Sequence, residues 1–326
     1  MDIFNDFFNF SNPLTFFTDS EITLSDKLLE FTYIIMGIIC IYTAIKNIRD
    51  NTNKDKVGTF IFWSILGIIL GVGRWIPNKL NGILIIIMTL PAILKKVGKG
   101  KIISLSEEKV KMLADKIGFK LFIPALSIGF FAILFAFTKL GPLVGMGVGV
   151  LVSIIILMVY SKENTVKVFF DEASNTLSIL GPLSLMPILL ASLGSIFDKA
   201  GIGDIISKII GNFIPEGNVK MGIVIFALGM VIFTMIMGNG FAAITVMLVG
   251  IANPFVLKYG ANPVIIGMIG LTAGYCGTLL TPMAANFNAL PVALLDMKDK
   301  FGVIKNQVLL SFVLLIFQII YMLMFS

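Results

Sequence analysis

Histidine is absent from this sequence of 326 residues, and cysteine occurs only twice, at Cys40 and Cys276. Histidine is the commonest general acid or base in enzymes, and cysteine and histidine together build most zinc sites. Two isolated cysteines among apolar and small residues give neither a disulfide framework nor a CxxC pair. We therefore expect no metal centre, no cofactor and no enzymatic activity.

Charged residues are also scarce. Asp, Glu, Lys and Arg make up 13% of the sequence, whereas about 25% is usual in a soluble domain. Hydrophobic residues make up 57%, and they stand in long uncharged runs. Because a bilayer core of roughly 30 Å needs about 20 apolar residues per helix, these runs predict membrane spans. The predicted fold class is an all-α polytopic membrane protein, with the lipid bilayer as its surroundings.

Most of the apolar runs have the length of one span. Six predict conventional helices, approximately at residues 28–45, 57–75, 80–94, 118–137, 140–160 and 177–197, and a last run predicts a span at 308–325. Residues 1–27 predict a segment at the membrane interface rather than a signal peptide, because acidic residues stand where a signal needs basic ones. Residues 201–214 predict an amphipathic helix along the interface, with Asp204 and Lys208 one turn apart.

Two apolar stretches, residues 219–256 and 262–297, are too long for one span each. A straight helix of either length would exceed about 50 Å. The first carries Gly238, Asn239 and Gly240 at its middle, and Gly and Asn readily adopt left-handed backbone angles, so it predicts a helical hairpin that either spans or re-enters. The second carries Pro282, which disfavours helix at Thr281, so it predicts one crossing with a break near its middle. About nine membrane segments are expected in all.

The basic residues indicate the orientation. With the N-terminus outside, the loops at 46–56, 95–120, 162–167 and 298–305 are cytoplasmic and hold 17 of the 25 Lys and Arg residues. This distribution agrees with the positive-inside bias of short loops. It requires the first long stretch to return to its own side and the second to cross, which puts the C-terminus outside. The net charge of +6 follows from these topology signals, so we expect no nucleic-acid partner.

Polar residues gather at the two predicted breaks. Between residues 217 and 295 there is no acidic residue, and the only charges are Lys220 and Lys258. Unwound backbone at membrane depth is stable only where it is buried in protein or lines a cavity, so a neutral polar cavity is expected there. Half-helix N-termini can hold a carboxylate in such a cavity, and C-terminal carbonyls with Asn and Thr oxygens can coordinate Na⁺. Without an acid or a histidine for proton coupling, Na⁺ is favoured as the coupling ion. The candidate substrate- or ion-binding residues are Gly238, Asn239, Gly240, Thr245, Tyr275, Thr278, Thr281, Pro282, Asn286 and Asn288.

Each feature also has a purely structural interpretation. Glycines 267, 270 and 274 are expected mainly to allow close helix packing. The asparagines at the breaks either bind a ligand or only cap helix ends, and we favour binding. Asp171 and Glu172 either relay protons or lie in a solvated cytoplasmic loop, and we favour the loop.

The stretches FTMIMGNGFAAITVMLVGI, residues 233–251, and GYCGTLLTPMAANFNALPVALLDMKDKFGVIKNQ, residues 274–307, resemble the bacterial membrane family catalogued as domain of unknown function 979. The resemblance covers nearly the whole chain apart from the N-terminal segment. It implies one subunit of a two-subunit 5-oxoproline (pyroglutamate) transporter in the bacterial cytoplasmic membrane.

That family is in turn similar to the ion transporter superfamily, whose members contain two inverted repeats, each with a hairpin and a broken helix, and work by an elevator motion. The resemblance implies one such repeat within residues 161–326 and a five-helix scaffold at 28–160. Residues 28–160 show no second set of breaks, which implies that a companion membrane subunit, or a second copy in a homodimer, supplies the other half. A non-transporting assembly or scaffold subunit, and a transporter of another small carboxylate, are the alternatives.

Overall fold

The computed structural model describes residues 11–100, 108, 111–112, 115, 117–181, 186–212, 214–215 and 217–326. The described residues form helices, turns and loops, with no strand among them, as an all-α fold requires. The start of the predicted interfacial segment and part of the lysine-rich loop lie outside the described residues. The chain forms two compact units, Met1–Gly181 and Pro182–Ser326, and each is described by itself.

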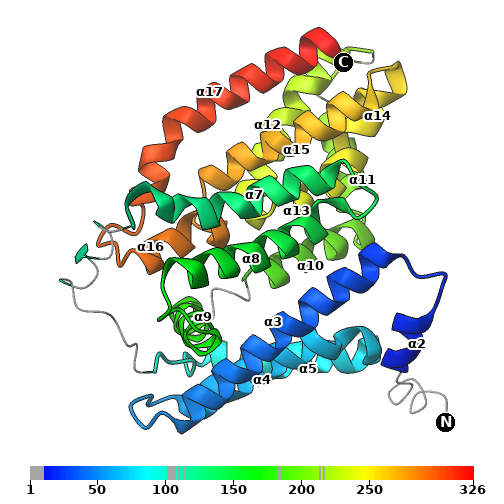
Figure 1. The fold of residues 1–326 in the computed structure, drawn as a ribbon. Coiled ribbons are helices and arrows are strands. Elements are labelled where there is room, and N and C mark those ends of the chain that lie inside the picture. Colours follow the sequence, from blue (N-terminus) through cyan, green and yellow to red (C-terminus); the bar gives the residue numbers. More distant parts are fainter. Residues whose placement is uncertain are drawn as a thin grey trace, which may run out of the picture. The chain divides into compact units, whose positions relative to one another are not determined.

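The first unit begins with a short helix, α2 (Pro13–Thr18), and three long ones, α3 (Leu24–Arg49), α4 (Lys56–Val72, continued by a 3-10 turn at Gly73–Trp75) and α5 (Asn78–Ile93). Helices α3 and α4 lie side by side (Figure 1). Glycines make this close packing possible, because a methyl group on Gly37 would lie 2.7 Å from the carbonyl oxygen of Gly67. Near the start of α3, the buried side chain of Glu30 forms an ion pair of 2.7 Å with Arg74, which lies just after α4.

A second helical pair and a single helix, α9, complete this unit. Helix α7 (Phe122–Ala136) follows a 3-10 turn at Gly118–Leu121 and packs against α8 (Gly141–Tyr160) through Gly145 and Gly149. Helix α9 (Val166–Leu180) packs against α3.

The span expected at 177–197 is not one helix. Helix α9 ends at Gly181, whose φ is +46°, and α10 (Met186–Lys199) is a separate helix. Glycine adopts this backbone angle without steric cost, and the proline that follows it in the sequence cannot donate a helical hydrogen bond. The first compact unit ends at this glycine.

The second unit contains α10, α11 (Ile202–Gly211), α12 (Val219–Met237) and α13 (Gly240–Met247), which a π-helical turn at Leu248–Ala252 and α14 (Asn253–Phe255) continue. Next come α15 (Pro263–Leu279), a π-helical turn at Ala285–Ala289, α16 (Leu290–Leu294) and α17 (Gly302–Phe325). Fully buried apolar side chains of α12, α13 and α15, such as Phe226, Val246 and Ile266, form its core. Helix α11 covers residues 202–211 of the amphipathic stretch predicted at 201–214, and α17 starts six residues before the predicted last span.

Seven helices among the described residues are long and apolar enough to cross a membrane, and α5 and α15 are shorter apolar helices. Their exposed surfaces carry large apolar side chains, such as Phe130 (61% exposed) and Leu309 (77%). In water such surfaces would be strongly unfavourable, whereas a bilayer solvates them. These helices confirm the prediction of membrane-spanning helices and fit a multi-pass membrane protein.

Candidate functional site

The predicted hairpin stretch forms two helices joined by a tight turn. Helix α12 ends at Gly238, whose φ is +67° and whose N–H donates to the carbonyl of Thr234 at 2.7 Å. Asn239 then caps α13, because its Oδ1 accepts hydrogen bonds from the N–H groups of Phe241 (2.9 Å) and Ala242 (3.3 Å). The chain runs back along α12, since a methyl group on Gly222 would lie 2.9 Å from the carbonyl oxygen at Phe255.

The predicted broken helix is interrupted where the proline rule places the break. Helix α15 ends at Leu279, and Thr281, directly before Pro282, is no longer helical. The side chain of Asn288 closes the break, because its Nδ2 donates to the carbonyls of Thr278 (2.8 Å) and Thr281 (2.7 Å). The Asn288 residue is 2% exposed, and its amide thus satisfies one carbonyl of the last helical turn and one carbonyl of the break.

The two breaks lie side by side within the second unit, although they are about forty residues apart in the sequence. The hydroxyl of Thr281 donates to the carbonyl of Met235, in the last turn of α12, at 2.9 Å. Gly240, the first residue of α13, faces Tyr275 of α15, and a methyl group on this glycine would lie 3.7 Å from the tyrosine ring. The end of α12, the start of α13 and the end of α15 therefore meet at one place, which we call the break junction.

Glycines of α15 allow this close approach. A methyl group on Gly277 would lie 2.5 Å from the carbonyl oxygen of Val231, and one on Gly274 would lie 2.8 Å from Met230. Gly270 is likewise covered by the ring of Phe226. The packing role expected for Gly270 and Gly274 is therefore present. Gly267 faces open space, so close packing within the described chain does not account for it.

Two buried oxygen atoms at the break junction have no hydrogen-bond partner in the part of the chain that the structure describes. One is Oδ1 of Asn288, and the other is the hydroxyl of Thr234, which is 0% exposed. A buried polar atom without a partner costs roughly 1–3 kcal/mol. Thr234 was not among the candidate residues, although its place one helical turn before Gly238 was a usable signal. Both atoms therefore have unused hydrogen-bonding capacity within the described chain.

Other candidates have their polar groups satisfied locally. The hydroxyl of Thr278 donates to the carbonyl of Tyr275 at 2.6 Å, and the hydroxyl of Thr245, exposed on α13, donates to the carbonyl of Ala242 at 2.9 Å. Thr278 belongs to the break junction through its backbone carbonyl, whereas Thr245 has no contact there among the interactions found in the described residues.

Tyr275 is the aromatic member of the junction. Its ring lies edge-on to Phe241, with centroids 6.1 Å apart, and 6.4 Å from the ring of Phe287. Pro282 is exposed in the turn, and the side chain of Asn286 lies outside the described part of the structure. Tyr275 thus connects the hairpin turn with the segment after the break.

The asparagines at the junction do cap helix ends, as the alternative interpretation required. Asn239 uses its oxygen for α13 and Asn288 uses its nitrogen for α15. Each amide has a second polar atom, and that of Asn288 is buried without a partner within the described chain. Capping therefore accounts for one polar atom of each amide, Oδ1 of Asn239 and Nδ2 of Asn288, and leaves the other unexplained.

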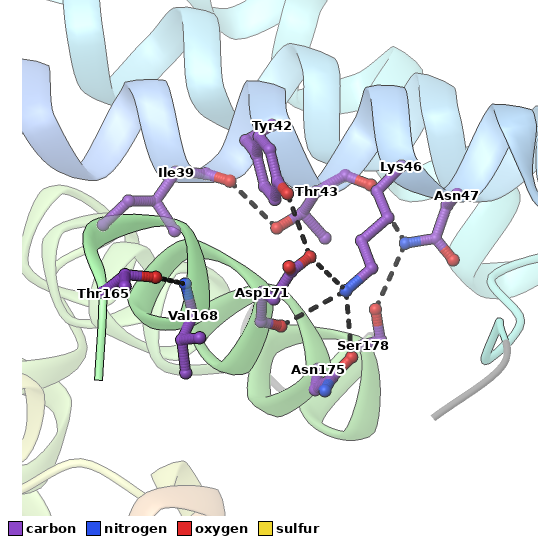
Figure 2. Close-up of polar contacts among 10 residues, drawn as sticks. All are labelled: Ile39, Tyr42, Thr43, Lys46, Asn47, Thr165, Val168, Asp171, Asn175 and Ser178. Carbon is purple, nitrogen blue, oxygen red and sulfur yellow. Dashed lines mark hydrogen bonds and ion pairs between the residues drawn. The ribbon is translucent and has the colours of Figure 1, made fainter. Parts of the chain in front are cut away.

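A separate polar cluster joins α3 and α9 in the first unit (Figure 2). Asp171 accepts a hydrogen bond from the hydroxyl of Tyr42 at 2.9 Å and forms an ion pair with Lys46 at 3.0 Å. Lys46 also donates to the side chain of Asn175 at 3.2 Å. The hydrogen bond from Lys46 lowers the pKa of Asp171, which stays ionised at neutral pH and is therefore unsuited to relaying protons. Asp171 lies in a helix, so the loop expected there is absent.

The family described as protein of unknown function (DUF979) matches residues 30–326. No curated protein and no solved structure matches the chain.

Proposed function

This chain belongs to the family of proteins of unknown function DUF979, and we propose that it is a membrane subunit of a secondary transporter for a small organic anion. The observation that carries the proposal is the break junction, where two interrupted helices meet and leave two buried oxygens unpaired within the described chain. Discontinuous helices of this kind build substrate and ion sites in secondary transporters.

The N-terminus of α13 is the proposed anion-binding element. It carries roughly half a positive charge, and its cap, Asn239, is neutral and leaves that charge uncompensated. The described residues of 219–294 contain no acidic side chain that would repel a carboxylate. A small carboxylate can therefore bind beside the turn without an arginine.

The proposed substrate is 5-oxoproline, as the resemblance to the transporter family implies. It has one carboxylate for the N-terminus of α13 and a lactam whose N–H needs an acceptor and whose carbonyl needs a donor. Among the described residues, Asn288 Oδ1 is an acceptor without a partner, and the hydroxyl of Thr234 is a donor without one. Another small carboxylate that carries an amide would satisfy the same atoms and is the alternative substrate.

Transport is proposed to be driven by a Na⁺ gradient, with no cofactor and no catalytic step. The carbonyl of Thr278 lies in the last turn of α15, whose C-terminus carries a partial negative charge, and the carbonyl of Thr281 follows just beyond that helix end. Each carbonyl has a second lone pair beyond its bond to Asn288. Such oxygens suit Na⁺ in the discontinuous helices of transporters.

The complete transporter is proposed to contain two such half-sites in an elevator arrangement in the bacterial cytoplasmic membrane, with both termini of this chain outside. A companion membrane subunit, or a second copy of the chain, would supply the second half. An assembly subunit that transports nothing is the competing function, since helix breaks can also bind a partner.

Uptake of labelled 5-oxoproline tests the proposal. Transport-null cells would express this chain alone and with its companion, each with and without a Na⁺ gradient. Na⁺-dependent uptake only with both chains supports the two-half transporter, whereas uptake by this chain alone supports the homodimer. The transporter proposal is wrong if both chains reach the membrane and neither labelled 5-oxoproline nor any of a panel of other labelled small carboxylates enters the cells.

A further inference from the structure

A long apolar groove runs between α4 and α5 in the first unit. Its volume is about 450 Å³. The apolar side chains that line it include Val57, Ile61, Ile87, Leu90 and Leu94, and Leu90 and Leu94 are 50% and 67% exposed. A groove of this composition accepts a hydrocarbon chain, because it offers a polar ligand almost no hydrogen-bonding partner along its length.

Charged residues lie at one end of this groove only. Lys54, Asp55 and Lys96 belong to its lining and stand at the start of α4 and just beyond the end of α5. The groove is therefore amphipathic along its axis, with an apolar body and a charged mouth.

The backbone fixes Lys96 at this mouth. After α5 the chain turns back at Lys95, whose φ is +55°, and the N–H of Lys96 donates to the carbonyl of Pro91 at 2.7 Å. The carbonyl of Lys96 is packed so tightly against Gly58 that a side chain on this glycine would collide with it. The main chain of Lys96 is thus held beside the groove. Binding a ligand therefore costs only the rotamer entropy of its side chain and no backbone entropy.

The mouth carries an excess of positive charge. Lys96 lies 3.3 Å from the carboxylate of Asp55, whereas Lys54 has no carboxylate within ion-pair distance in the described part of the chain. Two ammonium groups therefore face one carboxylate at the end of an apolar slot. An anion attached to a hydrocarbon chain matches both parts.

We propose that this groove binds one anionic phospholipid, with an acyl chain between α4 and α5 and the phosphate between Lys54 and Lys96. Basic pockets between membrane helices bind anionic head groups in this way, and each lysine near the surface contributes about fivefold to affinity. The site lies in the first unit and does not depend on the proposed transport function.

Native mass spectrometry of the purified full-length chain in detergent tests this proposal, with phosphatidylglycerol and phosphatidylcholine as the two probes. We expect phosphatidylglycerol to bind about fivefold more tightly, because Asp55 offsets one of the two lysines. The double variant Lys54→Gln, Lys96→Gln should lose this preference. The matched control Lys139→Gln, Lys258→Gln removes the same charge from two exposed lysines elsewhere and should keep it.

Two further variants separate the charged mouth from the apolar slot. Asp55→Asn frees Lys96 and should tighten phosphatidylglycerol binding by about fivefold. Leu90→Trp should fill the slot and weaken binding of both lipids while the lysines remain. An unchanged lipid preference in the lysine double variant would overturn the proposal. So would competition by inorganic phosphate at the lipid's own concentration, since this would show a phosphate site without a lipid chain.

Discussion

Asn239 and Asn262 form a natural matched pair, because each caps the first turn of a helix with the same two hydrogen bonds. Asn239 Oδ1 accepts from two N–H groups of α13 at 2.9 and 3.3 Å, and Asn262 Oδ1 accepts from two of α15 at 3.0 and 3.4 Å. Replacing either with alanine should cost the same stability, about 1 kcal/mol. In a chain of this size that cost lowers the unfolding temperature by roughly 1–2 °C.

Of these two caps, Asn239 lies at the break junction and Asn262 does not. Asn262 lies at the opposite end of α15, roughly 25 Å from the break at a rise of 1.5 Å per residue. If the first turn of α13 holds the substrate carboxylate, loss of the Asn239 amide disorders that turn and removes a polar neighbour of the anion. A hydrogen bond to a charged group is worth about 1.5–3 kcal/mol, so the apparent affinity for substrate should fall roughly tenfold to hundredfold.

The assay is uptake of labelled 5-oxoproline into proteoliposomes that contain this chain and its companion, over a range of substrate concentrations. Thermal unfolding of the same preparations measures the stability cost. The expected result is an equal loss of stability in Asn239→Ala and Asn262→Ala, with a raised substrate KM only in Asn239→Ala. Equal uptake by the two variants at equal stability would refute the assignment of α13 to anion binding.

Four further variants test hydrogen bonding, packing and charge. Asn288→Ala removes bonds of 2.8 and 2.7 Å to two buried carbonyls and should cost about 2–4 kcal/mol in chemical unfolding, and a loss below about 1 kcal/mol would contradict the geometry. Gly277→Ala puts a methyl group 2.5 Å from a backbone oxygen of α12 and should destabilise by roughly 1–3 kcal/mol. Gly267→Ala in the same helix, with open space around it, should be neutral or stabilise by up to about 1 kcal/mol in the same measurement. Asp171→Asn should cost less than about 1 kcal/mol at pH 7, because the ion pair with Lys46 is partly exposed. The folded state lowers the pKa of Asp171 below its ordinary 3.8, so the ion pair stabilises above that pH and is lost as the pH falls through the lowered value. Unfolding temperatures of wild type and variant should therefore converge at low pH, and a constant difference would exclude the ion pair as its cause.

The polar residues of the α3–α9 cluster illustrate what could not be predicted from sequence. Asp171 and Lys46 are separated by more than a hundred residues, and nothing local pairs them. The stretch around Asp171 carries apolar residues with helical spacing, but its polar content favoured a loop. Packing on α3 decides the outcome, because α3 supplies a cation and a hydroxyl to the carboxylate.

The sequence by itself determined the all-helical class, most of the helices and the positions of both helix breaks, whereas α9 and the start of α10 were not predicted. These follow from local physics, since apolar length, the missing N–H of proline and the left-handed freedom of glycine act within a few residues. Only the tertiary structure decided that the breaks meet and that Thr281 bonds to Met235. It also decided that Asn288 and Thr234 each keep an oxygen without a partner in the described part of the chain. These contacts join residues that are distant along the chain, and they depend on how closely α12 and α15 pack through the glycines of α15.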